Sequence, residues 1–340
     1  MYFAPSVICA NLRKSADHKP FIPNSKFPIG MPIEAIPEFP EQTQLERGHR
    51  DVLVTRFRAI GPVISEMSFS YLWCWKPHIS TTLSRFSGAV LVFFRNAKTG
   101  ETVALPPATD DSALAAAAAE AMLTDCVAGF QPAAIVRAPA GLAELFADHD
   151  GFTVGEERDR ADYVYAARDL RELPGQRYHS KRNHIKRFRG ACPDARYETM
   201  DAPLSAACVE FTREWLARHP AGDRPDLQRE VEVSVRMLEN YRWLGLTGGA
   251  MVDGERVVAF ALGERLSDDT FVVRVEKADT DVSGSYQTIN REFARAVPED
   301  CRWINREQDL GIPGLRRAKK SYHPDHLVRK YRIGVRQLGA

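Results

Sequence analysis

Side chains that can carry acid–base chemistry crowd into one short segment near the C-terminus, residues 305–309, which reads Asn-Arg-Glu-Gln-Asp. The segment follows a predicted strand over 302–305, and strand ends are where α/β folds gather ligands. Glu307 is therefore a candidate general base, because an incoming ammonium must lose a proton before it attacks an acyl carbonyl. Acyl transfer of this kind needs positioning and oxyanion stabilisation, and no metal site is expected.

A predicted helix over 315–322 comes next and sets Tyr322 beside Lys319 and Lys320. A tyrosine can protonate a leaving thiolate or alkoxide, and neighbouring cations are expected to favour its ionised form. The competing interpretation is a tyrosine that closes the core beside solvated lysines. We favour a functional role because the polar strand end lies close by in the predicted fold.

A second candidate base, Glu276, lies near the end of a predicted strand over 270–277, where that strand should separate from its neighbour. Gly284 then precedes a predicted helix that starts at Tyr286, and a helix N-terminus presents free N–H groups to an anion. A single glycine is a weak indication of an anion-binding loop. The alternative is that Glu276 and Lys277 form an ordinary surface pair.

The segment 177–189 holds six Lys or Arg residues and no acid in thirteen positions. On a helix, Tyr178, Lys181, Arg182 and Ile185 fall on one side. One interpretation is a helix that faces the phosphates of CoA, a tRNA end or a lipid headgroup. The other is a solvated basic helix that packs through its apolar residues, and the two stay open. With Glu276, Glu307 and Tyr322 as catalytic candidates, the residues expected to bind donor or substrate are Lys181, Arg182, Asn183, His184, Gly284, Tyr286, Asn305, Arg306, Asp309, Arg316, Lys319 and Lys320.

The charge of the 340-residue chain is nearly balanced, with 46 Lys and Arg against 45 Asp and Glu. That total argues against a nucleic-acid or membrane-surface protein. The charges are unevenly distributed, however: residues 101–150 hold one basic and eight acidic residues, whereas 301–340 hold ten basic and three acidic ones. The pattern predicts one phosphate-sized basic site on an otherwise acidic protein.

Other function classes are disfavoured. No apolar stretch approaches the roughly 20 residues of a membrane span, and no signal peptide is apparent. The six cysteines are scattered, which is typical of reduced thiols in the cytoplasm. His179 and His184 do not share a helical face, and no Gly-x-Ser-x-Gly, Walker A or GxGxxG motif occurs.

The predicted helices and strands follow the same order twice along the chain. A proline-rich arm over 1–48 comes first, since residues 1–45 carry seven of the 21 prolines. The repeats are predicted at 49–175 and 176–340, and the second should carry the site. Two helices, a three-stranded antiparallel meander and a strand–helix–strand unit predict a mixed α/β fold. That order fits tandem GNAT-like acyltransferase folds, each with a mostly antiparallel central sheet flanked by helices.

The chain also resembles a known bacterial family, a soluble domain-of-unknown-function family related to the C-terminal catalytic domain of phosphatidylglycerol lysyltransferase. The resemblance covers roughly residues 50–332 and implies the same tandem GNAT-like fold. It also implies relatives that transfer an aminoacyl group from aminoacyl-tRNA to a lipid or cell-wall precursor. The motifs that carry it are Glu-Met-Ser-Phe at 66–69, Lys-Arg-Asn-His at 181–184, Val-Glu-Lys-Ala-Asp at 275–279, Asn-Arg-Glu-Gln-Asp-Leu-Gly at 305–311, Gly-Leu-Arg at 314–316, Ala-Lys at 318–319 and Ser-Tyr-His-Pro at 321–324.

Two functions remain open from the sequence. The first is an acyl- or aminoacyltransferase that moves a group from aminoacyl-tRNA or acyl-CoA to an amine or hydroxyl acceptor. The second is a non-catalytic module that binds tRNA or a phosphorylated ligand. Neither needs a permanently bound cofactor. The expected partner is a phosphate-bearing small molecule or a tRNA acceptor end and not DNA, and a lipid acceptor at a membrane surface is compatible with both.

Overall fold

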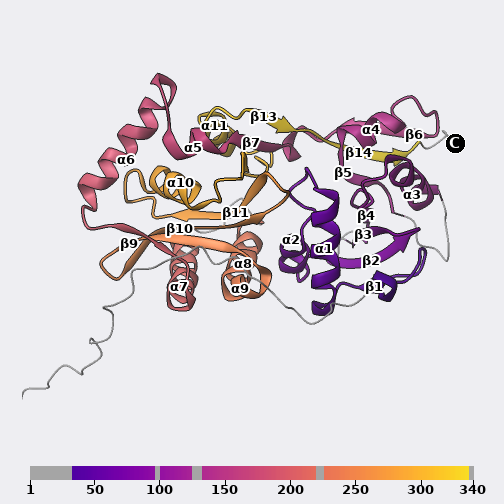
Figure 1. Ribbon diagram of the computed structural model, residues 1–340, viewed down its shortest axis with the longest axis horizontal. Helices are drawn as coiled ribbons and strands as arrows, with labels where there is room; N and C mark the ends of the chain where they lie inside the picture. Colours follow the sequence, from indigo (N-terminus) through magenta and orange to yellow (C-terminus); the bar gives the residue numbers. More distant parts are fainter. Residues whose placement is uncertain (1–32, 96–99, 125–131, 220–225, 337–340) are drawn as a thin grey trace, which may run out of the picture.

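The computed structural model describes residues 33–95, 100–124, 132–219 and 226–336. The chain forms two seven-stranded sheets, which lie side by side in Figure 1. Each sheet is antiparallel except for one parallel pair. This is the mixed α/β architecture that the sequence predicts. Residues 1–32 of the predicted arm and the turn expected at 96–99 lie outside the described residues.

The first sheet contains an unpredicted strand, because the Ser- and Thr-rich segment at 80–84 hides the usual hydrophobic pattern. A tight turn joins this strand to the next, with Ser87 and Gly88 both at positive φ. Such a turn matches the twist of the paired strands. In spatial order the strands are β1 (Thr43–Gln44), β2 (Ser80–Phe86), β3 (Ala89–Arg95), β4 (Thr102–Ala104), β5 (Ile135–Pro139), β14 (Lys330–Val335) and β6 (Phe152–Glu156).

The second sheet contains the predicted meander at its centre. Its outer strands, at 196–199 and 326–328, are short and were not predicted. In spatial order the strands are β13 (His326–Val328), β7 (Asp162–Ala166), β12 (Trp303–Asn305), β11 (Thr270–Ala278), β10 (Arg256–Arg265), β9 (Thr247–Asp253) and β8 (Arg196–Thr199).

Helices cover both faces of the second sheet (Figure 1). Two of them, α7 and α8, pack against each other on one face, while α5, α6 and α10 lie on the opposite face. Among the described residues, no helix has the length and apolar character needed to cross a bilayer. The helices are α1 (Arg50–Ile60), α2 (Phe69–Trp75), α3 (Ser112–Thr124), α4 (Ala140–Phe146), α5 (Ala167–Glu172), α6 (His179–Ala191), α7 (Ala202–Arg218), α8 (Asp226–Glu239), α9 (Tyr241–Leu244), α10 (Ser285–Ala296) and α11 (Pro313–Lys320).

The two sheets exchange one strand each. β7 belongs by sequence to the predicted first repeat, yet it pairs with β12 and β13 in the second sheet. β14 belongs to the predicted second repeat, yet it lies between β5 and β6 of the first sheet. The boundary at residue 175 stays a prediction, but neither sheet is built from one side of it alone.

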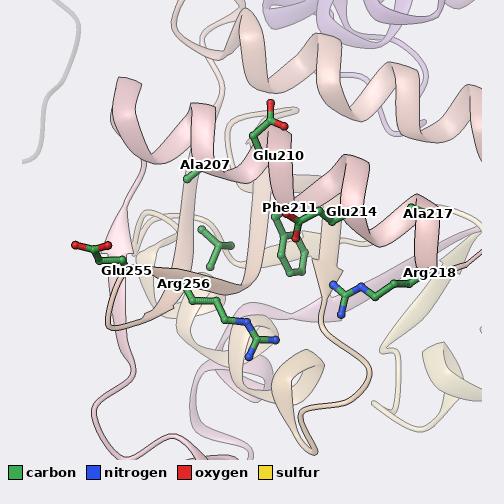
Figure 2. A pocket seen from close by; sticks show the side chains of 9 residues that line it. Ala207, Glu210, Phe211, Glu214, Ala217, Arg218, Glu255 and Arg256 are labelled. Atoms are coloured by element: carbon green, nitrogen blue, oxygen red, sulfur yellow. The ribbon is translucent and has the colours of Figure 1, made fainter. Parts of the chain in front are cut away.

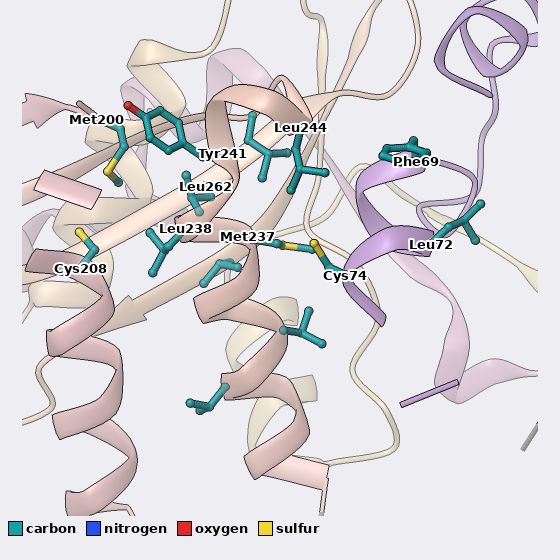
Figure 3. Close-up of a cluster of buried hydrophobic side chains, with 14 of the residues drawn as sticks. Phe69, Leu72, Cys74, Met200, Cys208, Met237, Leu238, Tyr241, Leu244 and Leu262 are labelled. Carbon is teal, nitrogen blue, oxygen red and sulfur yellow. The ribbon is translucent and has the colours of Figure 1, made fainter. Parts of the chain in front are cut away.

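The core is also shared between the two halves. One buried cluster joins α1 and α2 to α7, α8 and the meander strands. Figure 3 shows Cys74 of α2 next to Met237 of α8, with Leu238 and Leu262 farther along the same cluster. Because burial of apolar surface is the main stabilising contribution, this contact fixes α2 relative to the second sheet.

An opening between β11 and β12 positions the polar residues of interest. These parallel strands pair only from Thr270 with Trp303 to Val272 with Asn305. Beyond that point β11 continues to residue 278, whereas the chain after β12 is held on β7, where the Tyr163 amide donates to the Glu307 carbonyl. Glu276 and Glu307 both lie beyond the paired part of these two strands.

A β-bulge changes the direction of one side chain of β11, that of Arg274. Val273 pairs with Gly263 and Val275 pairs with Leu262, so Arg274 has no partner on β10. A Cβ atom at Gly263 would overlap the carbonyl oxygen of Val272. Glycine is therefore required there, and the bulge turns Arg274 toward the first half of the molecule, as bulges next to functional sites often do.

Candidate functional site

Arg274 is the centre of a buried ionic cluster at the junction of the two halves. Its side chain is 1% exposed, and its guanidinium lies 2.8 Å from Glu264 Oε1 and 2.7 Å from Glu307 Oε1. It also donates to the hydroxyl of Ser68 at the start of α2, 2.5 Å away, and Ser70 donates to Glu264. One cation thus joins two carboxylates to a serine pair from the other half.

Glu307 is the most accessible carboxylate of this cluster, with a quarter of its side chain exposed. Its Oε1 atom contacts Arg274, and no hydrogen bond engages its Oε2 atom within the described residues. Burial raises the pKa of Glu307, and the pairing with Arg274 only partly opposes this. A carboxylate with a free oxygen and a raised pKa is suited to accept a proton.

Glu276, the other candidate base, lies in a separate cluster on the far side of the same strand end. Its Oε1 accepts from Arg306 Nη2 at 2.9 Å, and its Oε2 accepts from Asn290 Nδ2 at 3.0 Å. Two buried atoms beside it, Arg306 Nη1 and Asn290 Oδ1, find no hydrogen-bond partner among the residues that the structure describes. Glu276 is thus held by two side chains, while an unpaired donor and an unpaired acceptor remain for a ligand or water.

The predicted neighbour of Glu276, Tyr322, does lie in this second cluster. Its ring lies between two cations, with Lys181 Nζ 4.0 Å and Arg306 Cζ 4.9 Å from the ring centroid. The expectation that cations would favour an ionised tyrosine is wrong. Burial raises the pKa of Tyr322 and outweighs the effect of Arg306, so the hydroxyl keeps its proton at neutral pH.

Two predicted lysines lie beside Tyr322. Lys319 is buried and donates to the carbonyl of Arg306, and Lys181 reaches Ser321 Oγ at 2.6 Å. Burial, with the nearby Arg306, lowers the pKa of each ammonium to about 8. Lys319 thus holds α11 from within, whereas Lys181 links α6 to the end of α11 at a partly exposed position.

Other predicted donor-binding residues are engaged in holding the scaffold. Arg182 donates to the carbonyls of Leu173 and Gly175, close to the end of α5. Asn183 contacts His179 Nε2 at 3.0 Å on the exposed side of α6. The structure thus gives Arg182 a capping role, whereas Asn183 stays accessible.

The glycine predicted to bind an anion, Gly284, lies in a close contact between α10 and α6. Gly284 is buried at the start of α10, and a Cβ atom there would overlap the carbonyl oxygen of His184 on α6. Its neighbour Tyr286 is half-buried, and burial raises the pKa of its hydroxyl to about 12. The glycine is thus explained by helix packing, and its anion-binding role stays a prediction.

Asp309 and Arg316 form a third cluster that shapes the loop after β12. Asp309 is fully buried, accepts from Tyr163 Oη at 2.6 Å and pairs with Arg316 Nε at 2.8 Å. Arg316 also contacts Asp159 at 2.6 Å. Asn305 is likewise fully buried, between β7 and Glu307. These three residues were predicted to contact ligand, but here they fix the strand end.

The cations left for a phosphate-bearing partner lie elsewhere on the same two helices. α6 and α11 lie side by side, since Tyr178 Oη donates to the Tyr322 carbonyl and Lys181 reaches Ser321. The basic blocks seen in the sequence therefore meet. Five basic residues of α6 and α11 are exposed and have no carboxylate partner within the described residues. We call them the basic surface, and they are Lys186, Arg187, Arg189, Arg317 and Lys320.

A buried charge cluster at the crossing between the sheets was not predicted at all. Lys330 pairs with Glu66 and Asp162, and Arg137 pairs with the other oxygen of Glu66 at 3.2 Å. Arg137 also contacts Glu157, 3.2 Å away. One indication was available, because Arg137 is the only basic residue between positions 101 and 150.

A surface groove of about 630 Å³ lies between α7 and β10 (Figure 2). Arg218 and Arg256 flank it, with Phe211 on the wall from α7. Both arginines pair with the buried Asp279. The lining of the groove includes no residue of the four clusters described above, so it is separate from the candidate chemistry.

Comparison with solved structures supports the fold. A conserved protein of unknown function from Bacteroides thetaiotaomicron VPI-5482 is 30% identical, with a TM-score of 0.80 over 87% of this chain and 99% of that chain. The C-terminal DUF2156 domain of a protein described as a lysylphosphatidylglycerol synthetase from Agrobacterium fabrum is 14% identical, with a TM-score of 0.60 over 86% and 93%. L-PGS from Bacillus licheniformis is 11% identical, with a TM-score of 0.52 over 76% and 84%.

These likenesses confirm the predicted fold class, and the two low-identity matches bear on the fold alone. No curated protein matches the sequence. The family model described as phosphatidylglycerol lysyltransferase, C-terminal, matches residues 57–334, which is most of the chain. The chain therefore belongs to the family of the phosphatidylglycerol lysyltransferase C-terminal domain, within the acyl- and aminoacyltransferases.

Proposed function

We propose that the protein transfers an aminoacyl group from aminoacyl-tRNA to an amine or hydroxyl acceptor, with Glu307 as the general base. The observation that carries this proposal is the opening between β11 and β12, where Glu307 presents a free carboxylate oxygen beside the buried Arg274. Membership of the lysyltransferase C-terminal family supports the reaction class.

The chemistry assigned to Glu307 follows from its surroundings. The acceptor must lose a proton as its nitrogen or oxygen attacks the ester carbonyl of the donor. Glu307 takes that proton, and its raised pKa makes it a stronger base than an ordinary carboxylate. The ester then breaks, and the departing tRNA hydroxyl regains a proton. Tyr322 keeps its proton at neutral pH and is our candidate to donate or orient there.

The tight packing of α6 against the start of α10 favours tRNA over acyl-CoA as donor. A CoA pyrophosphate binds close to a helix N-terminus, and at Gly284 the backbone of His184 on α6 leaves no room even for a Cβ atom. The same helix carries exposed, unpaired cations on its outer side, Lys186, Arg187 and Arg189. A row of unpaired cations fits a long polyanion better than a single pyrophosphate.

The direct test is a transfer assay with total tRNA charged with radiolabelled amino acids. Acceptors are offered in three pools: anionic phospholipid vesicles, cell-wall precursors and small amines. We expect label to move from tRNA to one pool. Glu307→Gln should reduce the rate by about a hundredfold or more, within the range of a lost general base. Glu299→Gln, which alters an exposed carboxylate after α10, is the matched control and should keep the wild-type rate.

Binding measurements separate the donors and the alternative function. Stabilisation against thermal unfolding by charged tRNA, without an effect of acetyl-CoA, supports the proposal. Stabilisation by acetyl-CoA instead would contradict the assignment of the donor. Equal binding of charged and uncharged tRNA with no transfer to any pool would favour the non-catalytic binding module.

A further inference from the structure

Lys330 lies at the point where the chain crosses from the second sheet to the first, and its side chain has no exposed surface. Its ammonium lies 2.6 Å from Glu66 Oε2 and 2.7 Å from Asp162 Oδ1. A buried cation needs such partners, because an unpaired one is strongly destabilising. Oδ1 of Asp162 thus accepts from Lys330, and it also accepts from the Ser65 hydroxyl at 3.0 Å.

The other oxygen of Asp162 determines how the Asn305 side chain is oriented. Oδ2 accepts from the Ser65 amide at 2.9 Å and from Asn305 Nδ2 at 3.1 Å. Because a carboxylate only accepts hydrogen bonds, Asn305 must turn its NH₂ group toward Asp162. Asn305 Oδ1 then faces the opposite way and accepts from the Glu307 amide at 2.7 Å.

The backbone of Glu307 needs this support. Its φ is +55°, a left-handed conformation that costs a non-glycine residue about 1–3 kcal/mol. The Asn305 side chain holds its N–H, and the Tyr163 amide donates to its carbonyl at 3.1 Å. Tyr163 follows Asp162 on β7, so one strand fixes both sides of the peptide that carries Glu307.

Asp162 also acts on Glu307 through charge. Burial has the largest effect on the pKa of Glu307 and raises it. Arg274 lowers this pKa, and the carboxylates of Asp162 and Glu66 raise it further. Within the described residues, the charged or titratable groups with electrostatic or ionic links to Glu307 or to its partner Arg274 are Arg274, Glu264, Asp162, Glu66, Tyr71, Cys74 and Lys319. Removing the charge of Asp162 alone should therefore lower the pKa of Glu307.

We propose that Asp162, anchored by Lys330, is a positioning residue for the reaction: through Asn305 it holds the backbone of Glu307 in the conformation that aims its carboxylate at the acceptor. The inference rests on the proposed role of Glu307 as base. The link joins a strand that completes the first sheet to the strand end of the second. Asp162 and Asn305, the two residues between Lys330 and Glu307 in this link, are fully buried, so water cannot replace their contacts.

The first variant is Asp162→Asn, which puts a hydrogen-bond donor where a carboxylate oxygen accepted. The new amide must turn its oxygen to Lys330, and its NH₂ then meets the NH₂ of Asn305. We expect kcat to fall by about tenfold or more, as a loss of one such contact predicts, with KM for the donor little changed. The acid limb of the pH–rate profile should move to lower pH.

The second variant restores the hydrogen bond between residues 162 and 305, although the Ser65 amide still lacks its acceptor. In Asp162→Asn combined with Asn305→Asp, the new Asn donates to the new Asp, whose other oxygen can accept from the Glu307 amide. We expect the double variant to be several-fold more active than Asp162→Asn. If Asp162→Asn instead lowered activity through general structural damage, the second substitution would add to that loss of activity.

Two further measurements keep the test valid if Asp162→Asn folds poorly. Asn305→Ala leaves the pair of Lys330 and Asp162 intact and should lower kcat by about tenfold. Carbon-13 labelling of glutamate carboxyls reports the titration of Glu307 directly, with its resonance assigned by loss in Glu307→Gln. This second readout needs no substrate.

The matched control is Asp279→Asn, because Asp279 is a carboxylate of equal burial that pairs with Arg218 and Arg256. It should lower stability but leave the Glu307 titration and the pH–rate profile unchanged. The proposal is overturned if Asp162→Asn leaves the Glu307 titration where it was, or if the double variant is no better than the single one. Failure of the wild type to transfer from any donor would instead remove the proposed function, while the titration still decides whether Asp162 acts on Glu307.

Discussion

Arg274 Nη1 lies 2.7 Å from Glu307 Oε1, and the same guanidinium reaches the hydroxyl of Ser68 in the other half of the molecule. A bulge in β11, made possible by Gly263, produces this relationship. The candidate base is thus held by a residue whose direction depends on one irregularity in the sheet. The first two predictions follow from that dependence.

Replacing Arg274 with lysine should damage both stability and transfer. Lysine keeps the charge but lacks the planar, forked donors that reach Glu264, Glu307 and Ser68 together. Breaking a buried pair of this kind typically costs about 3–5 kcal/mol, which urea unfolding can measure. Arg265→Lys, at a partly exposed pair with Asp300, should cost less than about 1 kcal/mol. Equal losses in the two variants would contradict the central role of Arg274.

Gly263→Ala should remove the bulge or strain it. The added methyl group would overlap the Val272 carbonyl and the Phe271 ring. We expect about 1–3 kcal/mol of destabilisation, as for other over-packed sites, together with loss of transfer activity. Gly141→Ala is the control, because its Cβ would meet nothing within 4 Å in α4. That variant should be neutral or slightly stabilising.

The buried pair of Glu66 and Lys330 should make stability depend on acid pH. Burial acts to raise the pKa of Glu66, but Lys330 and Arg137 outweigh it and hold that pKa below its usual value. The stabilisation is therefore present above the ordinary glutamate pKa of about 4.3 and is lost as pH falls through the lower folded value.

Urea unfolding from pH 7 to pH 3 measures this effect. Glu66→Gln should flatten the acid part of the stability curve relative to wild type. Glu299→Gln, at an exposed carboxylate, should leave the curve unchanged. An identical acid slope in wild type and Glu66→Gln would show that the pair does not titrate as described.

The basic surface should govern the salt dependence of tRNA binding. Changing Lys186, Arg187 and Arg189 together to alanine removes three exposed cations. Each phosphate contact contributes about one unit to the slope of log affinity against log salt, so the slope should fall by up to about three units. Alanine at Arg213 and Arg229, on α7 and α8, serves as the control. Binding that is unaltered by the triple change would place the tRNA elsewhere.

The sequence predicted the meander, the final helix and the polar strand end because each has a local signature. Continuous apolar runs on either side of the Asp-Gly turn at 253–254 define the strands at 247–253 and 256–265. The chemistry-bearing residues at 305–309 stand out because so many polar side chains follow a strand. Glu307 and Arg274 do lie together, but only Glu307 was predicted, because an arginine within a strand carries no sign of a bulge.

What the sequence could not reveal depends on contacts between distant segments. Asp162 and Lys330 are 168 positions apart, and each looks like an ordinary surface residue until the strands are exchanged. The packing role of Gly284 was missed for a similar reason. A glycine before a helix is typical of an anion-binding loop, but here the residue makes room for α6 to pack.

The exchanged strands also constrain how the protein is made. The first sheet lacks an interior member, β14, until residues 330–335 have left the ribosome, so β5 and β6 cannot be joined before then. Until then Glu66 and Asp162 also lack Lys330 as a partner. The nascent N-terminal half therefore cannot complete its sheet independently of the segment that follows the second sheet.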